Sequence, residues 1–486
     1  MASANGKAHD AVVHDPASAL ARRFRSPLSV SLIVLAALAV LAVAAFFGFR
    51  PVTGGGKNSV HVSGVAVGYL HACALLPGGT VKCWGFNGAG QLGHGVLNHG
   101  HQNKRMVEDL AIEEGFGASG DFSPNPVWVS GIRDATQISA ALLETCALIR
   151  GGTVKCWGDN VVGQLGDGVV DHGHKYANGG GDFSPTPVLV SGITNATQIS
   201  TSGSHACALL TGGRVKCWGA SLYGDLGDGR ASHGHYDSIA PLGDFSPVPV
   251  QVSGITDAVA VSAGVGYSCA VRKGGTVWCW GGAWDGVLGN GSTRGKNLTP
   301  VQVSGIRGAV AVNASDVRSC ALLNSGTVKC WGDNSFGELG DGKTDHGRKA
   351  DCSSWLQECS PTPVQVSGIT DATQISAGRG DPCAVLSDGH VWCWGDNSKG
   401  QLGDGLAAHG HRSGFSNAFS PTPVRVSGIT QATAVSTGER NSCALLSDGG
   451  VECWGENAYG QLGNGSAWRH VKGRVTPPVK VKGLGS

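Results

Sequence analysis

One pattern of thirteen residues, present in seven copies, most constrains the fold of this chain. It reads CALLPGGTVKCWG from Cys73 to Gly85, with a cysteine near each end and glycines in the middle. The other copies begin at Cys146, Cys207, Cys269, Cys320, Cys383 and Cys443. Seven copies of one pattern along the chain indicate a repeat protein, so the length of 486 residues does not by itself imply several unrelated domains.

Each copy predicts an antiparallel hairpin. An apolar run is followed by three loop residues and a second β-prone run, and the third loop residue is always glycine. A hairpin loop of three residues needs a left-handed backbone at that position, which is sterically costly for a residue with a Cβ atom. The glycines are Gly79, Gly152, Gly213, Gly275, Gly326, Gly389 and Gly449.

The hairpin places the two cysteines of each copy opposite each other. Counting outward from the loop Pro77–Gly79 pairs Cys73 with Cys83. Opposed residues have Cα atoms about 4.5–5.5 Å apart, within reach of a disulfide. The predicted bridges are Cys73 with Cys83, Cys146 with Cys156, Cys207 with Cys217, Cys269 with Cys279, Cys320 with Cys330, Cys383 with Cys393, and Cys443 with Cys453.

The last two cysteines, Cys352 and Cys359, lie in an insertion of one copy and predict a local eighth bridge. The alternative is reduced core cysteines, which a cytosolic protein would favour and an exported one would not. Zinc is disfavoured because ligand pairs at a spacing of two to four residues are absent from the sequence.

The N-terminal part predicts export. Leu28 to Phe49 contains no charged residue, and a helix of that length matches a hydrocarbon core of about 30 Å. Because Lys7, Arg22, Arg23 and Arg25 precede it, we expect a single-pass anchor with the N-terminus in the cytoplasm and the chain after Arg50 outside. The alternative is a cleaved signal peptide ending at Ala42–Ala44, which would secrete the rest.

Each unit contains four extended segments: a PVxV run, a run of small residues such as Ala258–Gly264, and the two hairpin strands. Four short strands per unit are typical of a propeller blade. We therefore expect an all-β, seven-bladed propeller of four-stranded blades, preceded by one transmembrane helix. The predicted organisation is a cytoplasmic segment at 1–27, the membrane helix at 28–49, a linker at 50–58 and the propeller at 59–486.

The repeats resemble the regulator of chromosome condensation repeat family. Its unit combines an H-x-x-A-L strand, a G-x-V-x-x-W-G strand and a G-Q-L-G turn, found here at His71–Leu75, Gly79–Gly85 and Gly90–Gly93. The resemblance covers about Val60 to the C-terminus and implies a seven-bladed propeller. It also implies a range of functions, since relatives act in nucleotide exchange, light sensing, enzyme inhibition and adhesion-like roles.

Long loops are the candidate binding elements. Extra length falls between a GDG-type turn and the following SPxPV segment, so the loops share one strand-to-strand connection and are expected on one side of the ring. These loops are 98–122, 169–183, 231–245, 344–360 and 406–420.

Four of these loops carry a His-Gly-His pair, and a fifth carries His346. Residues i and i+2 of an extended segment share a face, so one hypothesis is a metal ion bound by both imidazoles, with Asp121, Asp182 or Asp244 as a third ligand. The other is exposed turn residues multiplied by duplication, and because no diagnostic ligand spacing exists we predict no metal or other cofactor. The pairs are His99 and His101, His172 and His174, His233 and His235, and His409 and His411.

The remaining features favour a binding protein. The formal charge of +1 argues against nucleic-acid binding, and no catalytic set, phosphate loop or cofactor fingerprint stands in a supporting context. We expect a non-enzymatic surface protein whose loop face binds another protein or a wall or glycan component. The alternatives are a metal-dependent module or enzyme at the His-Gly-His loops, and a guanine-nucleotide exchange factor by analogy with the family.

Overall fold

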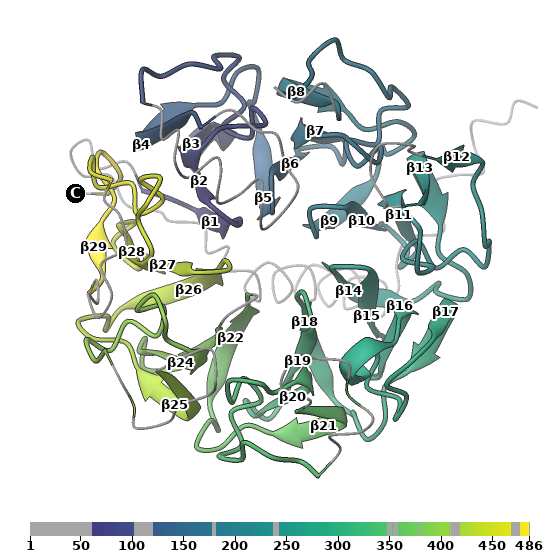
Figure 1. Ribbon diagram of the computed structural model, residues 1–486, viewed down its shortest axis with the longest axis vertical. Coiled ribbons are helices and arrows are strands. Elements are labelled where there is room, and N and C mark those ends of the chain that lie inside the picture. The colour runs from purple at the N-terminus through teal and green to yellow at the C-terminus, as the bar shows by residue number, and fades with distance from the viewer. Residues whose placement is uncertain are drawn as a thin grey trace, which may run out of the picture. The chain divides into compact units, whose positions relative to one another are not determined.

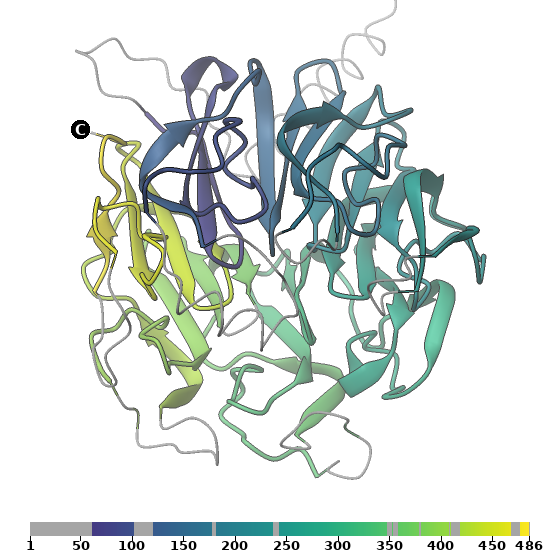
Figure 2. The same ribbon diagram turned by 45° about the horizontal axis from the view of Figure 1, so that its top comes forward.

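A computed structural model describes residues 61–101, 120–176, 181–236, 243–347, 352, 358–378, 381–407, 409, 418–467 and 477–485. They form seven antiparallel sheets around a central axis (Figures 1 and 2). The prediction of an all-β, seven-bladed propeller of four-stranded blades is confirmed. The predicted segments 1–27, 28–49 and 50–58 lie outside the described residues; within the described ranges, no helix has the length and hydropathy needed to cross a bilayer.

The blades are numbered here in chain order, and each runs from an innermost to an outermost strand. Blades 1 to 4 consist of β1 (Gly64–Val67), β2 (His71–Leu75), β3 (Val81–Phe86), β4 (Phe122–Trp128); β5 (Ala135–Ala141), β6 (Glu144–Ile149), β7 (Val154–Asp159), β8 (Phe183–Leu189); β9 (Ala196–Thr201), β10 (His205–Leu210), β11 (Val215–Ala220), β13 (Asp244–Gln251), with β12 (His235–Tyr236) added at the edge; and β14 (Ala258–Gly264), β15 (Tyr267–Arg272), β16 (Val277–Gly282), β17 (Lys296–Gln302).

Blades 5 to 7 repeat the same order. They consist of β18 (Ala309–Ala314), β19 (Arg318–Leu323), β20 (Val328–Asp333), β21 (Cys359–Gln365); β22 (Ala372–Ala377), β23 (Pro382–Leu386), β24 (Val391–Asp396), β25 (Phe419–Arg425); and β26 (Ala432–Thr437), β27 (Asn441–Leu446), β28 (Val451–Gly455), β29 (Val479–Lys480). The described residues also contain two short 3-10 turns, η2 (Pro77–Gly79) and η3 (Trp284–Gly286).

The PVxV run closes a blade rather than opening it. It pairs with the second hairpin strand that precedes it in the chain, so every sheet is made from one continuous stretch. The C-terminal PVxV run provides β29 in this way, with Val479 opposite Cys453. The ring closes through packing of β1 against β26 and through a backbone hydrogen bond from Val62 N to Gly449 O (3.2 Å).

The predicted three-residue hairpin loop is confirmed. In blade 1, Leu76 and Thr80 hydrogen-bond across the loop, and Gly79 has φ +73°. A Cβ atom on Gly79 would lie 2.4 Å from the backbone nitrogen of Ala135 in blade 2. Glycine is therefore required here both by the backbone conformation and by the approach of the next blade.

The inner strands are joined around the axis by side-chain oxygens. At six of the seven junctions, an oxygen from one inner strand accepts the backbone N–H of a residue in the next inner strand. Ala66 of β1, at the junction of blades 1 and 2, is the equivalent residue without such an oxygen. The six bonds run from Thr201 to Ser139 (3.1 Å), Ala263 to Ser200 (3.0 Å), Ala314 to Ser262 (2.9 Å), Ala377 to Asn313 (3.0 Å), Thr437 to Ser376 (3.0 Å) and Val67 to Ser436 (3.0 Å).

The tryptophan of each CWG sequence lies in the interface between blades. All seven are fully buried, and each indole N–H donates to a backbone carbonyl in the G-x-L-G turn of the preceding blade. Because the last of these bonds joins blades 7 and 1, the same indole–carbonyl bond occurs at all seven junctions. The bonds are Trp157 to Gln91 (2.9 Å), Trp218 to Gln164 (2.8 Å), Trp280 to Asp225 (2.9 Å), Trp331 to Val287 (2.8 Å), Trp394 to Glu338 (2.8 Å), Trp454 to Gln401 (2.8 Å) and Trp84 to Gln461 (2.9 Å).

The outermost strands contain the prolines of the SPxPV segments. The carbonyl of the first proline accepts a hydrogen bond from a turn glycine of the preceding blade, for example from Gly95 N to Pro185 O (3.0 Å). The same bond joins Gly465 to Pro124 (3.0 Å) across the closing junction. The outer strands thus hold neighbouring blades together through carbonyl groups.

Candidate binding face

Disulfides join the two strands of every hairpin. Cys73 stands directly opposite Cys83 in the sheet register, and their Cα atoms are 4.1 Å apart, closer than the usual cross-strand distance. The other hairpin bridges are Cys146–Cys156, Cys207–Cys217, Cys269–Cys279, Cys320–Cys330, Cys383–Cys393 and Cys443–Cys453, and the eighth is Cys352–Cys359. Within the described part of the chain no cysteine is free.

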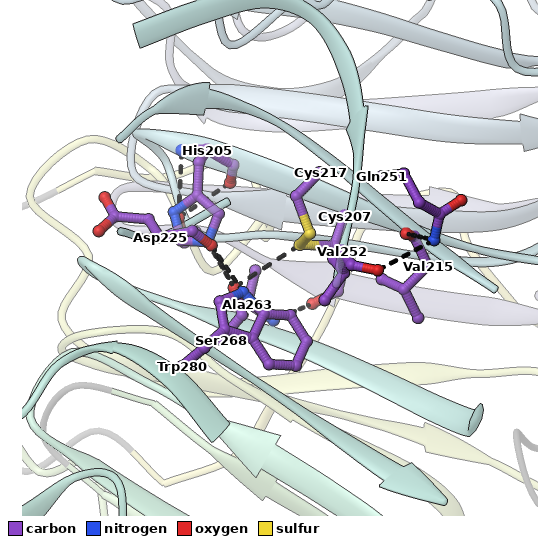
Figure 3. The surroundings of a disulfide bond; sticks show 12 residues. His205, Cys207, Val215, Cys217, Asp225, Gln251, Val252, Ala263, Ser268 and Trp280 are labelled. Atoms are coloured by element: carbon purple, nitrogen blue, oxygen red, sulfur yellow. Dashed lines mark hydrogen bonds between the residues drawn. A yellow bond between two sulfur atoms is a disulfide. The ribbon is translucent and has the colours of Figure 1, made fainter. Parts of the chain in front are cut away.

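Figure 3 shows how one bridge is embedded in a blade junction. Cys207 and Cys217 are fully buried, and the Sγ atom of Cys207 lies 3.6 Å from the Oγ atom of Ser268 in the next blade. His205 Nε2 also contacts Ser268 Oγ at 2.7 Å. The bridge, the histidine and the serine therefore form one continuous contact between blades 3 and 4.

His205 occupies a position of the repeat at which a polar side chain is buried, and the sequence analysis did not predict this burial. The residue two positions before the first cysteine is fully or almost fully buried in all seven blades. Its side chain commonly bonds the residue just before the first cysteine of the next blade: His71 with Thr145 (2.8 Å), His205 with Ser268 (2.7 Å), Tyr267 with Ser319 (2.9 Å) and Asp381 with Ser442 (2.9 Å). The seven residues are His71, Glu144, His205, Tyr267, Arg318, Asp381 and Asn441.

A signal for this position was present in the sequence, because each copy has a side chain able to form hydrogen bonds two residues before its first cysteine. Burial lowers the pKa of His71 and of His205 to about 3, so both imidazoles are neutral at physiological pH. Burial likewise raises the pKa of Asp381 well above its ordinary value. These groups face blade contacts, and we assign them a structural role.

The glutamate in the turn of blade 5 is explained by the residue two positions before the first cysteine of that blade. Arg318 replaces the histidine in blade 5, and its Nη2 donates to Glu338 Oε1 at 2.9 Å. Glu338 stands where four of the other six turns have glutamine. The buried guanidinium therefore has a carboxylate partner from within its own blade.

The first histidine of each His-Gly-His pair fastens its loop to the ring. His172 donates from Nδ1 to Asp182 Oδ2 (2.6 Å) and from Nε2 to Asp167 Oδ2 (2.9 Å). Asp167 belongs to the GDG turn and Asp182 to the GDFSP segment, so the imidazole bridges the two ends of the loop. Hydrogen bonds to the two carboxylates raise the pKa of His172 to about 9.

The same Asp–His–Asp arrangement occurs in blade 3. His233 contacts Asp244 through Nδ1 (2.7 Å) and Asp228 through Nε2 (3.0 Å). The loops of blades 5 and 6 retain the contact with the GDG carboxylate, from His346 to Asp341 (3.0 Å) and from His409 to Asp404 (3.2 Å).

The second histidine of a pair has a different partner. Its ring packs on the phenylalanine of the FSP segment, with centroid distances of 5.3 Å for His101 and Phe122, 5.4 Å for His174 and Phe183, and 5.4 Å for His235 and Phe245. His411 lies outside the described residues. The hypothesis that both imidazoles of a pair hold one metal ion is not supported by these contacts, since the first ring bonds carboxylates and the second packs on an aromatic ring.

Blade 1 departs from this arrangement. His94 replaces the aspartate of the GDG turn, and its ring stacks on His99 with a centroid distance of 4.5 Å. Asp121 still accepts from His99 Nδ1 at 2.6 Å. Burial and the neighbouring His99 lower the pKa of His94 to about 4, so the His94 imidazole is uncharged at neutral pH.

Comparison with known proteins identifies the repeats. Two models of the regulator of chromosome condensation (RCC1) repeat match the chain, one at residues 325–384, 388–445 and 448–486, the other at 62–91, 196–225, 309–338, 372–401 and 432–461. The ultraviolet-B receptor UVR8 of Arabidopsis thaliana is 26% identical, over 86% of this chain and 82% of its own. The human E3 ubiquitin-protein ligase HERC2 is 27% identical over 64% of this chain, but that match spans only 6% of HERC2.

Solved structures share the fold. Yeast RCC1 (Prp20), in a structure with Kap60, superimposes with a TM-score of 0.62 and 19% identity, covering 89% of this chain and 91% of its own. Human WBSCR16 gives a TM-score of 0.61 with 20% identity, covering 83% and 94%. The chain is therefore a seven-bladed propeller that carries repeats of the regulator of chromosome condensation type.

Proposed function

We propose that this protein is a non-enzymatic binding module, anchored in a membrane and exposed outside the cytoplasm, whose loop face binds another protein. The observation that carries the proposal is the fastening of long loops to a rigid ring. The loops of blades 2 and 3 are closed at their base by Asp–His–Asp contacts, and both leave from the connection between the third and outermost strands. Loops on a rigid scaffold are a common basis of recognition.

The comparisons support a protein partner ahead of a wall or glycan component. Prp20p from Saccharomyces cerevisiae, whose solved structure is similar to this chain, has binding properties toward Gsp1p and histones. Such a likeness also leaves guanine-nucleotide exchange as the second candidate. The disulfides favour the exported version, because bridges of this kind form and persist in oxidising compartments.

Blade 4 offers the template for a direct test. Its turn Gly289–Gly291, the equivalent of Gly166–Gly168 in blade 2, is separated from the outermost strand β17 by only the four residues 292–295, so the extra loop length is missing there. Replacing residues 169–182 of blade 2 by Ser-Thr-Arg-Gly from blade 4 removes the loop and its histidine contacts together. We expect the chimera to fold and to lose partners that the unaltered protein captures by cross-linking on intact cells.

The matched control is Arg150→Ala, an exposed residue at the hairpin end of the same blade. Equal capture by the chimera and the unaltered protein would refute binding through the blade 2 loop. The exchange-factor candidate is separated by topology: protease added to intact cells digests an external propeller, whereas a propeller that survives until the cells are lysed faces the cytosol.

A further inference from the structure

The outer rim of the ring differs from blade to blade. In each blade, the residue before the second cysteine pairs with the last exposed residue of the outermost strand. Lys82 pairs with Trp128 in blade 1 and Lys155 pairs with Leu189 in blade 2. Trp128 and Leu189 are both 56% exposed, and among the described residues Leu406 is the one other large apolar side chain that reaches this value.

The other blades show that the fold does not require apolar residues there. The equivalent rim residues are Gln251, Gln302, Gln365, Arg425 and Lys480. Seven blades share one strand geometry, so the difference belongs to the surface and not to the packing of the sheet. We therefore consider whether Trp128 and Leu189 form part of a binding surface.

Lysines link the two apolar residues into one surface. Lys82 Nζ lies 4.5 Å from the centre of the Trp128 ring. Lys155 Nζ donates to the carbonyl of Gly131 (3.2 Å), just beyond Trp128 in the chain, although Lys155 itself pairs with Leu189. Lys155 thus stands between the two apolar side chains.

The next lysine continues the series. Lys216 of blade 3 donates in the same way to the carbonyl of Gly192 (3.3 Å), just beyond Leu189. The strands β4 and β8 lie on the outside of neighbouring blades (Figure 1). We call this surface, formed by Lys82, Trp128, Lys155, Leu189 and Lys216, the rim stripe.

The charge of the rim stripe is available for a partner. Within the described residues, none of its three ammonium groups forms an ion pair with a carboxylate. Partly exposed lysines beside apolar side chains complement carboxylates that alternate with apolar groups. Tryptophan is also enriched among the residues that contribute most to binding.

We propose that the rim stripe binds an acidic segment of a partner protein that carries apolar side chains between its carboxylates. A lipid surface with negative charge is the competing occupant. The stripe is narrow, since exposed polar residues Asn125 and Thr186 stand on the same outer strands, and a narrow stripe suits a peptide better than a flat bilayer. This site is formed by residues other than those of the long loops and does not depend on the function proposed above.

The test uses the full chain and a fluorescein-labelled synthetic peptide of alternating glutamate and leucine, with fluorescence anisotropy as the readout. The peptide with lysine in place of glutamate is the charge control. We expect saturable binding of the acidic peptide alone, weakened at least about tenfold when salt is raised from about 0.05 to 0.5 M.

Two double variants borrow residues that other blades already tolerate. Trp128→Gln with Leu189→Gln copies blades 3 to 5, and Lys82→Glu with Lys155→Glu copies Glu452 of blade 7. Each pair should weaken peptide binding about tenfold or more, whereas Gln302→Ala with Gln365→Ala should change it less than about twofold.

Three results would overturn the proposal: no saturable binding of the acidic peptide, an equal loss in the glutamine control, or stripe-dependent binding to phosphatidylserine vesicles without binding to the peptide. The last result would assign the stripe to a membrane. Phosphatidylcholine vesicles serve as the uncharged comparison.

Discussion

The junction between blades 1 and 2 lacks a contact that the other six junctions have, and restoring it should stabilise the protein. At the six others, a side-chain oxygen accepts the backbone N–H of the next inner strand at distances such as 2.9 Å for Ser262 and Ala314. Ala66 occupies the corresponding place in blade 1 and is 6% exposed. The hydroxyl of a serine at this position would be largely buried and would face the backbone N–H of Ala140.

A hydrogen bond of this kind contributes about 0.5–1.5 kcal/mol net. We therefore expect Ala66→Ser to raise the free energy of unfolding by about 1 kcal/mol. The measurement is equilibrium unfolding in urea under oxidising conditions, followed by tryptophan fluorescence.

The matched removal is Ser262→Ala, which leaves the Ala314 N–H without its acceptor and should lower the free energy of unfolding by about 1–2 kcal/mol. If Ser262→Ala destabilises the protein while Ala66→Ser has no effect or a negative one, the reasoning fails. That result would mean that the first junction is not organised like the others.

Three further expectations concern the repeats and the loops. Replacing Cys146 and Cys156 together by alanine should cost about 3 kcal/mol of unfolding free energy on the chain-entropy account, and peptide mapping by mass spectrometry without reductant should find no free thiol at either position in the unaltered protein. Gly93→Ala should cost about 2 kcal/mol or more in urea unfolding, because its Cβ would lie 2.5 Å from Trp157 Nε1 and its φ is +69°. The pKa of His172 is raised to about 9 from an unfolded value of 6.5, so its stabilisation is complete below about pH 6.5 and is lost as pH rises through 9; hydrogen exchange in the blade 2 loop should increase over that interval, and no increase relative to His172→Gln would contradict the assignment.

Repetition made the architecture predictable from the sequence. Gly79 and its equivalents specify the hairpin, and the hairpin in turn specifies which cysteines face each other. The boundary of a blade was not predictable in the same way, since the PVxV run lies between two hairpins and its pairing with the earlier one depends on tertiary contacts. The hydrogen bonds between the indoles and the turn carbonyls could not be predicted from the sequence either, because they join residues of different repeats.

The loops show a second limit. The spacing of His172 and His174 was compatible with a shared ligand, yet the two rings have different partners in the structure. Asp167 and Asp182 bind the two nitrogens of the first ring from the two ends of the loop, whereas the second ring packs on Phe183. Alternation along a strand predicts which side chains share a face, but it does not predict which neighbours arrive there.

The prolines of the outer strands have a consequence for behaviour in concentrated solution. A sheet edge with free N–H groups is a template for growth by a second molecule. Pro185 and its equivalents have no N–H to offer, and their carbonyl groups are already taken by the preceding blade. The outer strands that carry such a proline, in blades 1, 2, 3, 5 and 6, should therefore resist fibril formation through their edges.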